Sequence, residues 1–305
     1  MMPIEPKFAA LLTSIDAQLD RLTQAPPSAG LFVVATPIGH LADITVRALA
    51  TLQVVDVIYA EDTRHSRTLL QQYGITTPLR AYHDHSSEAV RHSIVQTILE
   101  GARVGLISDA GTPMVSDPGF KLIRAVIDAE LDVVPLPGAS AVMAAIMCAG
   151  LPTDRFQFAG FLPTKRAARL HALEAAVDAP VTSIWFEAPS RLLATLADMQ
   201  DIFGERKVVV LRELTKHFED KARGPAADLL QKFTDKPVKG EVVIMLEPAQ
   251  SSAAVGDGEL QALLKERLGD TTLRDAVQMV AKMSGTPRKR VYDLALHLQR
   301  SGVDK

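Results

Sequence analysis

The chain has 305 residues, with 47% hydrophobic and 23% charged residues and a formal net charge of −3. This composition excludes a protein that is disordered along its whole length, and the small net charge excludes the strong basic field of many nucleic-acid-binding proteins. Any RNA contact must therefore come from local patches. No apolar run is long enough for a transmembrane helix, and the single cysteine, Cys148, excludes an internal disulfide. We expect a soluble, cytoplasmic protein that does not associate with membranes.

Residues 1–29 are predicted to form an N-terminal extension, either an appended helix or a tail. A first α/β domain is predicted over residues 30–150, because short apolar runs typical of strands alternate there with longer helical patterns. The expected strands are 31–35, 54–60, 79–82, 104–107 and 132–135, and the expected helices are 45–52, 64–73, 87–100, 120–129 and 139–149. This alternation predicts an open, largely parallel sheet with helices on both faces and ligands at the carboxyl ends of its strands.

A second α/β domain is predicted over residues 151–248. Its expected strands are 157–161, 182–186, 207–211, 222–224 and 241–246, and its expected helices are 165–177 and 189–203. No long helix is expected in the stretch 213–224. The sequence there therefore predicts a hairpin, and with it a mixed sheet.

The third part, residues 256–305, is predicted to be a small helical appendage after a linker rich in Ala, Ser and Gly. Its expected helices are 259–267, 272–283 and 287–299, with Thr286 as N-cap and Pro287 at the first helical position. The arrangement is similar to a helix-turn-helix unit. Its last helix begins with the basic residues Arg288, Lys289 and Arg290, which could contact phosphates. The alternative is a small helical bundle with a solvated basic edge.

Three junctions in the first domain have the chemistry of ligand-binding loops. The most informative one follows an apolar strand and reads Ser108-Asp109-Ala110-Gly111-Thr112-Pro113. Its aspartate can accept hydrogen bonds from a ligand, while its glycine allows close approach of the backbone and its proline stiffens the turn. Similar junctions lie at 33–39 and 133–140. We expect the three strand ends to converge on one crevice.

Several motifs together resemble the tetrapyrrole-methylase superfamily of S-adenosylmethionine-dependent enzymes. These are ATPIGHLADIT at 35–45, AEDTR at 60–64, SDAGTP at 108–113, DPG at 117–119 and PLPG at 135–138. Three further motifs resemble the branch that methylates the cytidine 2′-hydroxyl of 16S rRNA: FLP at 161–163, FEAPSRL at 186–192 and RELTK at 212–216. The resemblance covers roughly residues 30–247 and the helical appendage. One departure is His40, where the rRNA branch usually has asparagine.

The resemblance implies a two-domain tetrapyrrole-methylase-like fold with S-adenosylmethionine bound in the cleft between the α/β domains. It also implies a homodimer that transfers the methyl group to a cytidine ribose near the decoding centre of the small ribosomal subunit. The residues expected to bind the cofactor are Pro37, Asp109, Thr112, Gly138, Ala139 and Ser140. For some of these, turn geometry alone is the alternative explanation.

A ribose 2′-hydroxyl is a poor acid, so its attack is easier when a nearby group accepts the proton. The residues we expect to act in catalysis are Glu61, Asp62, Arg64, Lys165 and Glu187. Glu61 and Asp62 follow a strand and face the crevice, but they could instead cap the next helix. Lys165 and Glu187 lie at strand ends of the second domain, where a solvated surface position is the alternative. Arg166, Arg169 and His171 are predicted to add a modest basic strip.

Two other functions remain open on the sequence. One is a methyltransferase that acts on a tetrapyrrole or another small molecule. The other is a ligand-sensing or RNA-binding protein that keeps the cofactor pocket but has no turnover. We expect no metal site, because His83 and His85 share a face but have no obvious third ligand.

Overall fold

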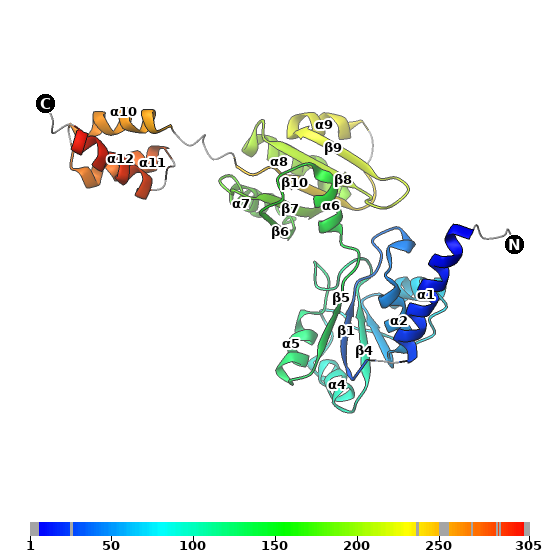
Figure 1. Cartoon of the computed structure of the whole chain (residues 1–305). Coiled ribbons are helices and arrows are strands. Elements are labelled where there is room, and N and C mark those ends of the chain that lie inside the picture. The colour runs from blue at the N-terminus through cyan, green and yellow to red at the C-terminus, as the bar shows by residue number, and fades with distance from the viewer. Residues whose placement is uncertain are drawn as a thin grey trace. The chain divides into compact units, whose positions relative to one another are not determined.

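The computed structural model describes residues 6–24, 27–235, 238–249, 256–269, 271–284, 286 and 288–301. The chain forms two compact units, of which the first comprises Met1–Glu174 with Thr182–Glu247 and the second comprises Ala175–Val181 with Pro248–Lys305. The first unit contains two five-stranded sheets (Figure 1). We refer to the parts that carry them as its first half and its second half. No helix in the described ranges is long and apolar enough to cross a membrane.

The sheet of the first half is parallel throughout and has the strand order β3-β2-β4-β1-β5. Its strands are β1 (Gly30–Val34), β2 (Val57–Ala60), β3 (Leu79–Ala81), β4 (Arg103–Ile107) and β5 (Val133–Leu136). Its helices are α2 (Val46–Val54), α3 (Thr63–Gln72), α4 (Glu88–Leu99) and α5 (Phe120–Asp128). Residues of α4 and α5 pack in one apolar cluster with the sheet, and residues of α2 and α3 pack in another. The predicted parallel sheet with helices on both faces is confirmed.

The next helix, α6 (Ala141–Ala149), packs on the sheet of the second half. Its Val142 and Ala145 belong to one buried cluster with Val209 and Met245 of that sheet. Ile38, from the loop after β1, lies in the same cluster. The two halves therefore share an apolar core, and burial of this core fixes the loops of the first half against the second sheet.

The sheet of the second half has the order β6-β7-β10-β8-β9. Its strands are β6 (Phe156–Phe161), β7 (Thr182–Glu187), β8 (Lys207–Arg212), β9 (Asp220–Pro225) and β10 (Val242–Leu246). β6 is parallel to β7 and the other pairs are antiparallel, so the predicted mixed sheet and the β8–β9 hairpin are confirmed.

Three further helices accompany this sheet: α7 (Arg166–Glu174), α8 (Leu192–Phe203) and α9 (Ala226–Thr234). Helix α9 was not predicted from the sequence. The signal was present, because Ala226, Leu229 and Phe233 are buried at the spacing of one helix face. The helix begins directly after strand β9 without a side-chain cap, which hid its start.

The predicted basic strip on α7 is wrong for Arg169. Asp198 of α8 accepts hydrogen bonds from Nε of Arg166 at 2.9 Å and from Nε of Arg169 at 2.8 Å. Arg169 and Asp198 are both buried. A buried charge is stable only with a partner, so Arg169 serves to hold α7 against α8 and is not available to RNA.

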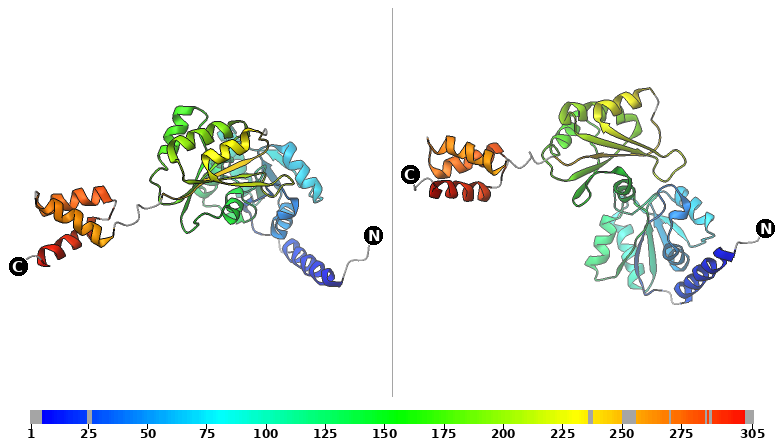
Figure 2. Two further views of the ribbon diagram at one scale, coloured as in Figure 1. Left: turned by 90° about the horizontal axis from the view of Figure 1, so that it is seen from above. Right: turned by 45° about the horizontal axis from the view of Figure 1, so that its top comes forward.

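The first and last segments that the structure describes are helical. Helix α1 (Pro6–Gln24) lies against α2, and the second unit contains the helices α10 (Asp257–Leu268), α11 (Leu273–Ser284) and α12 (Arg288–Ser301) (Figure 2). Their shared core is Leu260, Leu264, Val277, Val280, Val291 and Ala295. The predicted three-helix appendage is confirmed. Pro287, predicted at the first position of the last helix, lies outside the described residues.

Candidate active site

Backbone hydrogen bonds join the loops that follow β1 and β4. The N–H of Thr36 donates to the Gly111 carbonyl at 2.8 Å, and the N–H of Gly111 donates back at 3.0 Å. The loop after β5 joins them, because the Thr112 hydroxyl donates to the Ala139 carbonyl at 3.1 Å. Gly111 has φ of 79°, and a Cβ there would lie 3.0 Å from the Ile38 side chain, so the close approach favours glycine. The predicted convergence of three strand ends is confirmed.

These loops border a first cavity of about 320 Å³, a size typical of small-molecule sites. The first half contributes polar residues to it, among them Asp109, Thr112, Asp117 and Ser140. The second half contributes mainly apolar ones, including Phe161, Phe186, Val242 and Val243. A ligand in this cavity would therefore meet carboxylates on one side and apolar surface on the other.

A second cavity of about 360 Å³ shares part of its lining with the first. It is lined by the β1 loop, by one face of α3, and by Lys216 and Glu241 of the second half. Ile38, Asp109, Ala110 and Glu241 line both cavities.

An acidic cluster of Glu61, Asp109 and Asp117 lies at the carboxyl ends of β2 and β4. Burial, followed by the charges of Glu61 and Asp109, raises the pKa of Asp117 to about 7, although a hydrogen bond with Ser108 opposes this shift. Burial and the charge of Asp109 likewise raise the pKa of Glu61. From the sequence, Asp117 was recognised only as part of the DPG motif and not as a candidate site residue. Its importance comes from three-dimensional contacts that no local pattern encodes.

Asp109 is the predicted cofactor residue with the most informative contacts. Its Oδ1 accepts a hydrogen bond from the N–H of Asp62 at 3.0 Å, and its Oδ2 has no partner among the described residues. Of the other predicted cofactor residues, Thr112 and Ser140 line the first cavity and Pro37 lines the second. Gly138 and Ala139 precede Ser140 in the β5 loop, and a Cβ on Gly138 would lie 2.9 Å from that of Ala35.

Asp62 and Arg64 are bound to each other at the start of α3. Oδ1 of Asp62 accepts the Arg64 N–H at 2.8 Å, and its Oδ2 pairs with Nη2 of Arg64 at 3.0 Å. These hydrogen bonds lower the pKa of Asp62 to about 2. Asp62 is thus the N-cap of α3, as the alternative interpretation held, and at neutral pH it is a weak proton acceptor.

Glu187 has a completely buried side chain. Its carboxylate accepts hydrogen bonds from the Thr195 hydroxyl at 2.6 Å and from the Ala188 N–H at 2.7 Å, and it is ion-paired with Arg191. These contacts fix the turn at Ala188, which lines the first cavity. Lys165, in contrast, is exposed before α7 and lines neither of the two cavities.

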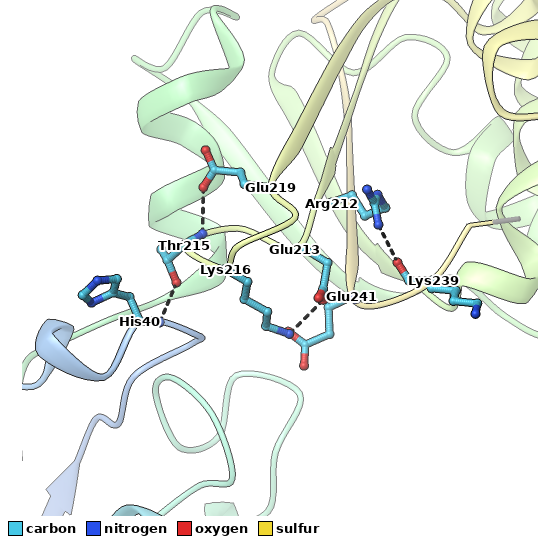
Figure 3. A network of polar contacts seen from close by, with 8 residues as sticks. All are labelled: His40, Arg212, Glu213, Thr215, Lys216, Glu219, Lys239 and Glu241. Carbon is cyan, nitrogen blue, oxygen red and sulfur yellow. Dashed lines mark hydrogen bonds and ion pairs between the residues drawn. The ribbon is translucent and has the colours of Figure 1, made fainter. Parts of the chain in front are cut away.

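His40 connects the β1 loop to the second half through its backbone. Its N–H donates to Oγ1 of Thr215 at 3.1 Å (Figure 3). The imidazole caps a short 3-10 helix, Leu41–Asp43, by accepting the Ala42 N–H at 3.3 Å. An asparagine side chain can perform the same capping.

Lys216 is held by two glutamates at the edge of the second cavity (Figure 3). Its Nζ lies 2.9 Å from Oε1 of Glu213 and 3.1 Å from Oε2 of Glu241. Burial alone would lower the pKa of Lys216, but these hydrogen bonds outweigh burial and raise it. The ammonium group is therefore firmly charged at neutral pH. In the described part of the chain, no group of three or more His, Cys, Asp and Glu residues could hold a metal ion.

The comparisons with known proteins agree with this architecture. The family model of tetrapyrrole (corrin/porphyrin) methylases matches residues 30–230, and the model of the RsmI C-terminal HTH domain matches residues 254–299. The chain belongs to the tetrapyrrole methylase family. Among solved structures, cobalt precorrin-4 methyltransferase is similar with a TM-score of 0.55 at 18% identity, covering 71% of this chain and 94% of the other. At 18% identity, this similarity is evidence for the fold alone.

Two relatives are similar over almost their whole length. The chain is 42% identical to "Ribosomal RNA small subunit methyltransferase I" of Synechocystis sp., covering 89% of this chain and 99% of the relative. It is 44% identical to the protein of the same name from Pseudomonas aeruginosa, with the same two coverages.

The raised pKa of Asp117 predicts a pH-dependent stability. The folded-state pKa of about 7 exceeds the ordinary value of 3.8, so the folded protein retains a proton that the unfolded chain releases. The free energy of unfolding is therefore highest below the ordinary pKa of Asp117. It decreases as the pH rises from there towards 7, by up to about 1.4 kcal/mol per pH unit. Asp117→Asn mimics the protonated form, so the melting temperature of the wild type should fall relative to this variant between about pH 4 and 7 and stay level above pH 7.

The matched control is Asp154→Asn, which changes an exposed aspartate of the same unit. Thermal melting should show the same pH dependence for this control and the wild type. Parallel curves for the wild type and Asp117→Asn would show that Asp117 ionises normally.

Proposed function

We propose that this protein transfers a methyl group from S-adenosylmethionine to the ribose 2′-hydroxyl of a cytidine in 16S rRNA, near the decoding centre of the small ribosomal subunit. The observation that carries this proposal is the full-length similarity to relatives named ribosomal RNA small subunit methyltransferase I. It includes the C-terminal helical unit, which matches its own family model. A ribosomal substrate also supports a cytoplasmic location.

The first cavity suits the cofactor on chemical grounds. S-adenosylmethionine supplies an electrophilic methyl group on a positively charged sulfonium. The carboxylates of Asp109 and Asp117 border the cavity and favour a cation, while Phe161 and Val243 offer apolar surface for a nucleoside. The free Oδ2 of Asp109 is an acceptor for an ammonium or hydroxyl group of the ligand.

The residues proposed to hold the cofactor are those predicted from the sequence. Asp109, Thr112 and Ser140 line the first cavity, Gly138 and Ala139 belong to the loop that carries Ser140, and Pro37 lines only the second cavity and would act through the shape of the β1 loop. The hydrogen bonds between their loops support this role, because methyl transfer depends mainly on the alignment of the donor and acceptor atoms. Preformed loops reduce the entropy lost when the ligand binds.

The predicted catalytic residues divide into three roles. Glu61 and Asp117 are the proposed proton acceptors: both belong to the acidic cluster and the pKa of each is raised, but only Asp117 lines the first cavity, so Glu61 would act through the cluster. Glu187 is proposed to position the turn beside the first cavity, and Asp62 to position α3. Exposed Arg64 and Lys165 are proposed to contact RNA phosphates.

Methyl transfer tests the proposal directly. Wild-type protein should transfer labelled methyl from S-adenosylmethionine to small ribosomal subunits that lack the modification, and cleavage mapping should place it on one cytidine ribose. Asp109→Asn should weaken donor binding by about 10- to 100-fold, because a hydrogen bond to a charged group is lost. Asp154→Asn is again the control. Donor binding without transfer to subunits or free rRNA would contradict the RNA assignment and favour a small-molecule acceptor or a sensing protein.

The second unit is proposed to bind RNA through the first turn of α12. Arg288 and Lys289 are exposed there, whereas Arg290 is ion-paired with Asp257 at 2.7 Å. The double variant Arg288→Ala with Lys289→Ala should weaken subunit binding and reduce the slope of log affinity against log salt by about 1 to 2. Lys265→Ala with Arg274→Ala removes the same charge from exposed positions and should change the slope less. Equal slopes for the two double variants would contradict this role of α12.

We also propose that the protein is a homodimer. Met143 and Met147 lie four residues apart on α6 and are 50% and 85% exposed, which is unusual for large apolar side chains on one helix face. Sedimentation should give the mass of two chains for the wild type and of one chain for Met147→Glu. Leu99→Glu, which changes an exposed apolar residue on α4, should remain dimeric. A single-chain mass for the wild type would contradict the proposal.

A further inference from the structure

The second cavity lies next to the first but has a different lining. The residues on α3 that face it are His65, Thr68, Leu69 and Gln72, which repeat at the spacing of one helix face. Three of these four side chains can form hydrogen bonds, and the buried residues of α3, Ser66 and Leu70, do not line the cavity. A polar helix face directed at a cavity suits a polar ligand.

Lys216 brings an ammonium group to this cavity, which is also lined by the carboxylates of Asp109 and Glu241. An ammonium group has three N–H donors, and Glu213 and Glu241 accept two of them. The third donor has no partner among the described residues, so it remains available to a ligand oxygen. The Glu213 carboxylate also accepts a hydrogen bond from the Glu241 N–H at 2.9 Å, so the two glutamates that bind Lys216 are held together (Figure 3). The position of the charge is thus set by the protein before any ligand binds.

The two cavities meet at Ile38, Asp109, Ala110 and Glu241, which line both. A group bound in one cavity can therefore reach a group bound in the other beside the Asp109 carboxylate. Methyl transfer needs two ligands that approach each other at one point while their other parts remain apart.

We infer that the second cavity holds the target nucleotide of the RNA, with the α3 face contacting its polar edges and Lys216 contacting its phosphate. This inference rests on the proposed function. At the shared wall, the ribose oxygen forms a bond to the methyl carbon as the carbon–sulfur bond breaks and its electron pair stays on sulfur. The hydroxyl proton passes to a carboxylate of the acidic cluster.

Neighbouring glutamines of α3 provide a matched test. Gln71 and Gln72 are both exposed, but only Gln72 lines the cavity. Gln72→Trp should fill the cavity and lower methyl transfer to small ribosomal subunits at least about 10-fold, mainly through KM, with less than a twofold change in the Kd of S-adenosylmethionine. Gln71→Trp should behave as wild type. Circular dichroism and thermal melting of both variants check that the fold is unchanged.

The outcomes separate this inference from the proposed function. Normal KM for Gln72→Trp, or an equal loss in Gln71→Trp, would overturn the inference. Loss of S-adenosylmethionine binding in Gln72→Trp would also overturn it, by assigning the cavity to the donor. If the wild type transfers no methyl to RNA, the proposed function fails. Anisotropy with a 16S rRNA fragment then decides the cavity's role, since Gln72→Trp should weaken binding at least fivefold relative to Gln71→Trp, and equal binding would overturn the inference.

Discussion

The pair of backbone hydrogen bonds between Thr36 and Gly111 is the contact on which the site depends. It locks the loops after β1 and β4 together at the carboxyl end of the sheet. Ile38 and Asp109, on either side of this contact, line both cavities, and Ile38 also enters the core shared with the second half. A loop without such pairing would have to be ordered by the ligand at an entropic cost. In this protein the loops are already ordered in the folded chain, so ligand binding does not carry this entropic cost.

Sequence periodicity predicted the helices and strands well, because the spacing of apolar residues marks the buried face of each element. The ten strands expected in the two sheets all occur, and the β8–β9 hairpin followed from the absence of a long helix in 213–224. Helix α9 was missed because no cap marks its start. The pairing of Arg169 with Asp198 was missed because the two residues lie on different helices, and a charged residue in isolation is expected at the surface.

The candidate site was predictable in position but not in electrostatics. Loop chemistry together with the family resemblance identified Asp109, Thr112 and Ser140, which line the first cavity. The raised pKa of Asp117 depends on burial and on carboxylates that come from separate strand ends, and these distances exist only in the folded chain. Lys216 likewise gains its defined position from Glu241, which lies 25 residues away in the sequence, directly before strand β10.

The carboxylates that line both cavities bear on how one protein can bind both proposed ligands. The acidic cluster favours a cationic cofactor, but the same field repels a phosphate backbone. An RNA substrate must then be held by positive charges outside the cluster. Lys216 provides one in the first unit, and Arg288 and Lys289 provide others in the second. Lys216 is partly neutralised by Glu213 and Glu241, so in a protein with a net charge of −3 the exposed pair Arg288 and Lys289 has to supply much of the attraction for a polyanion.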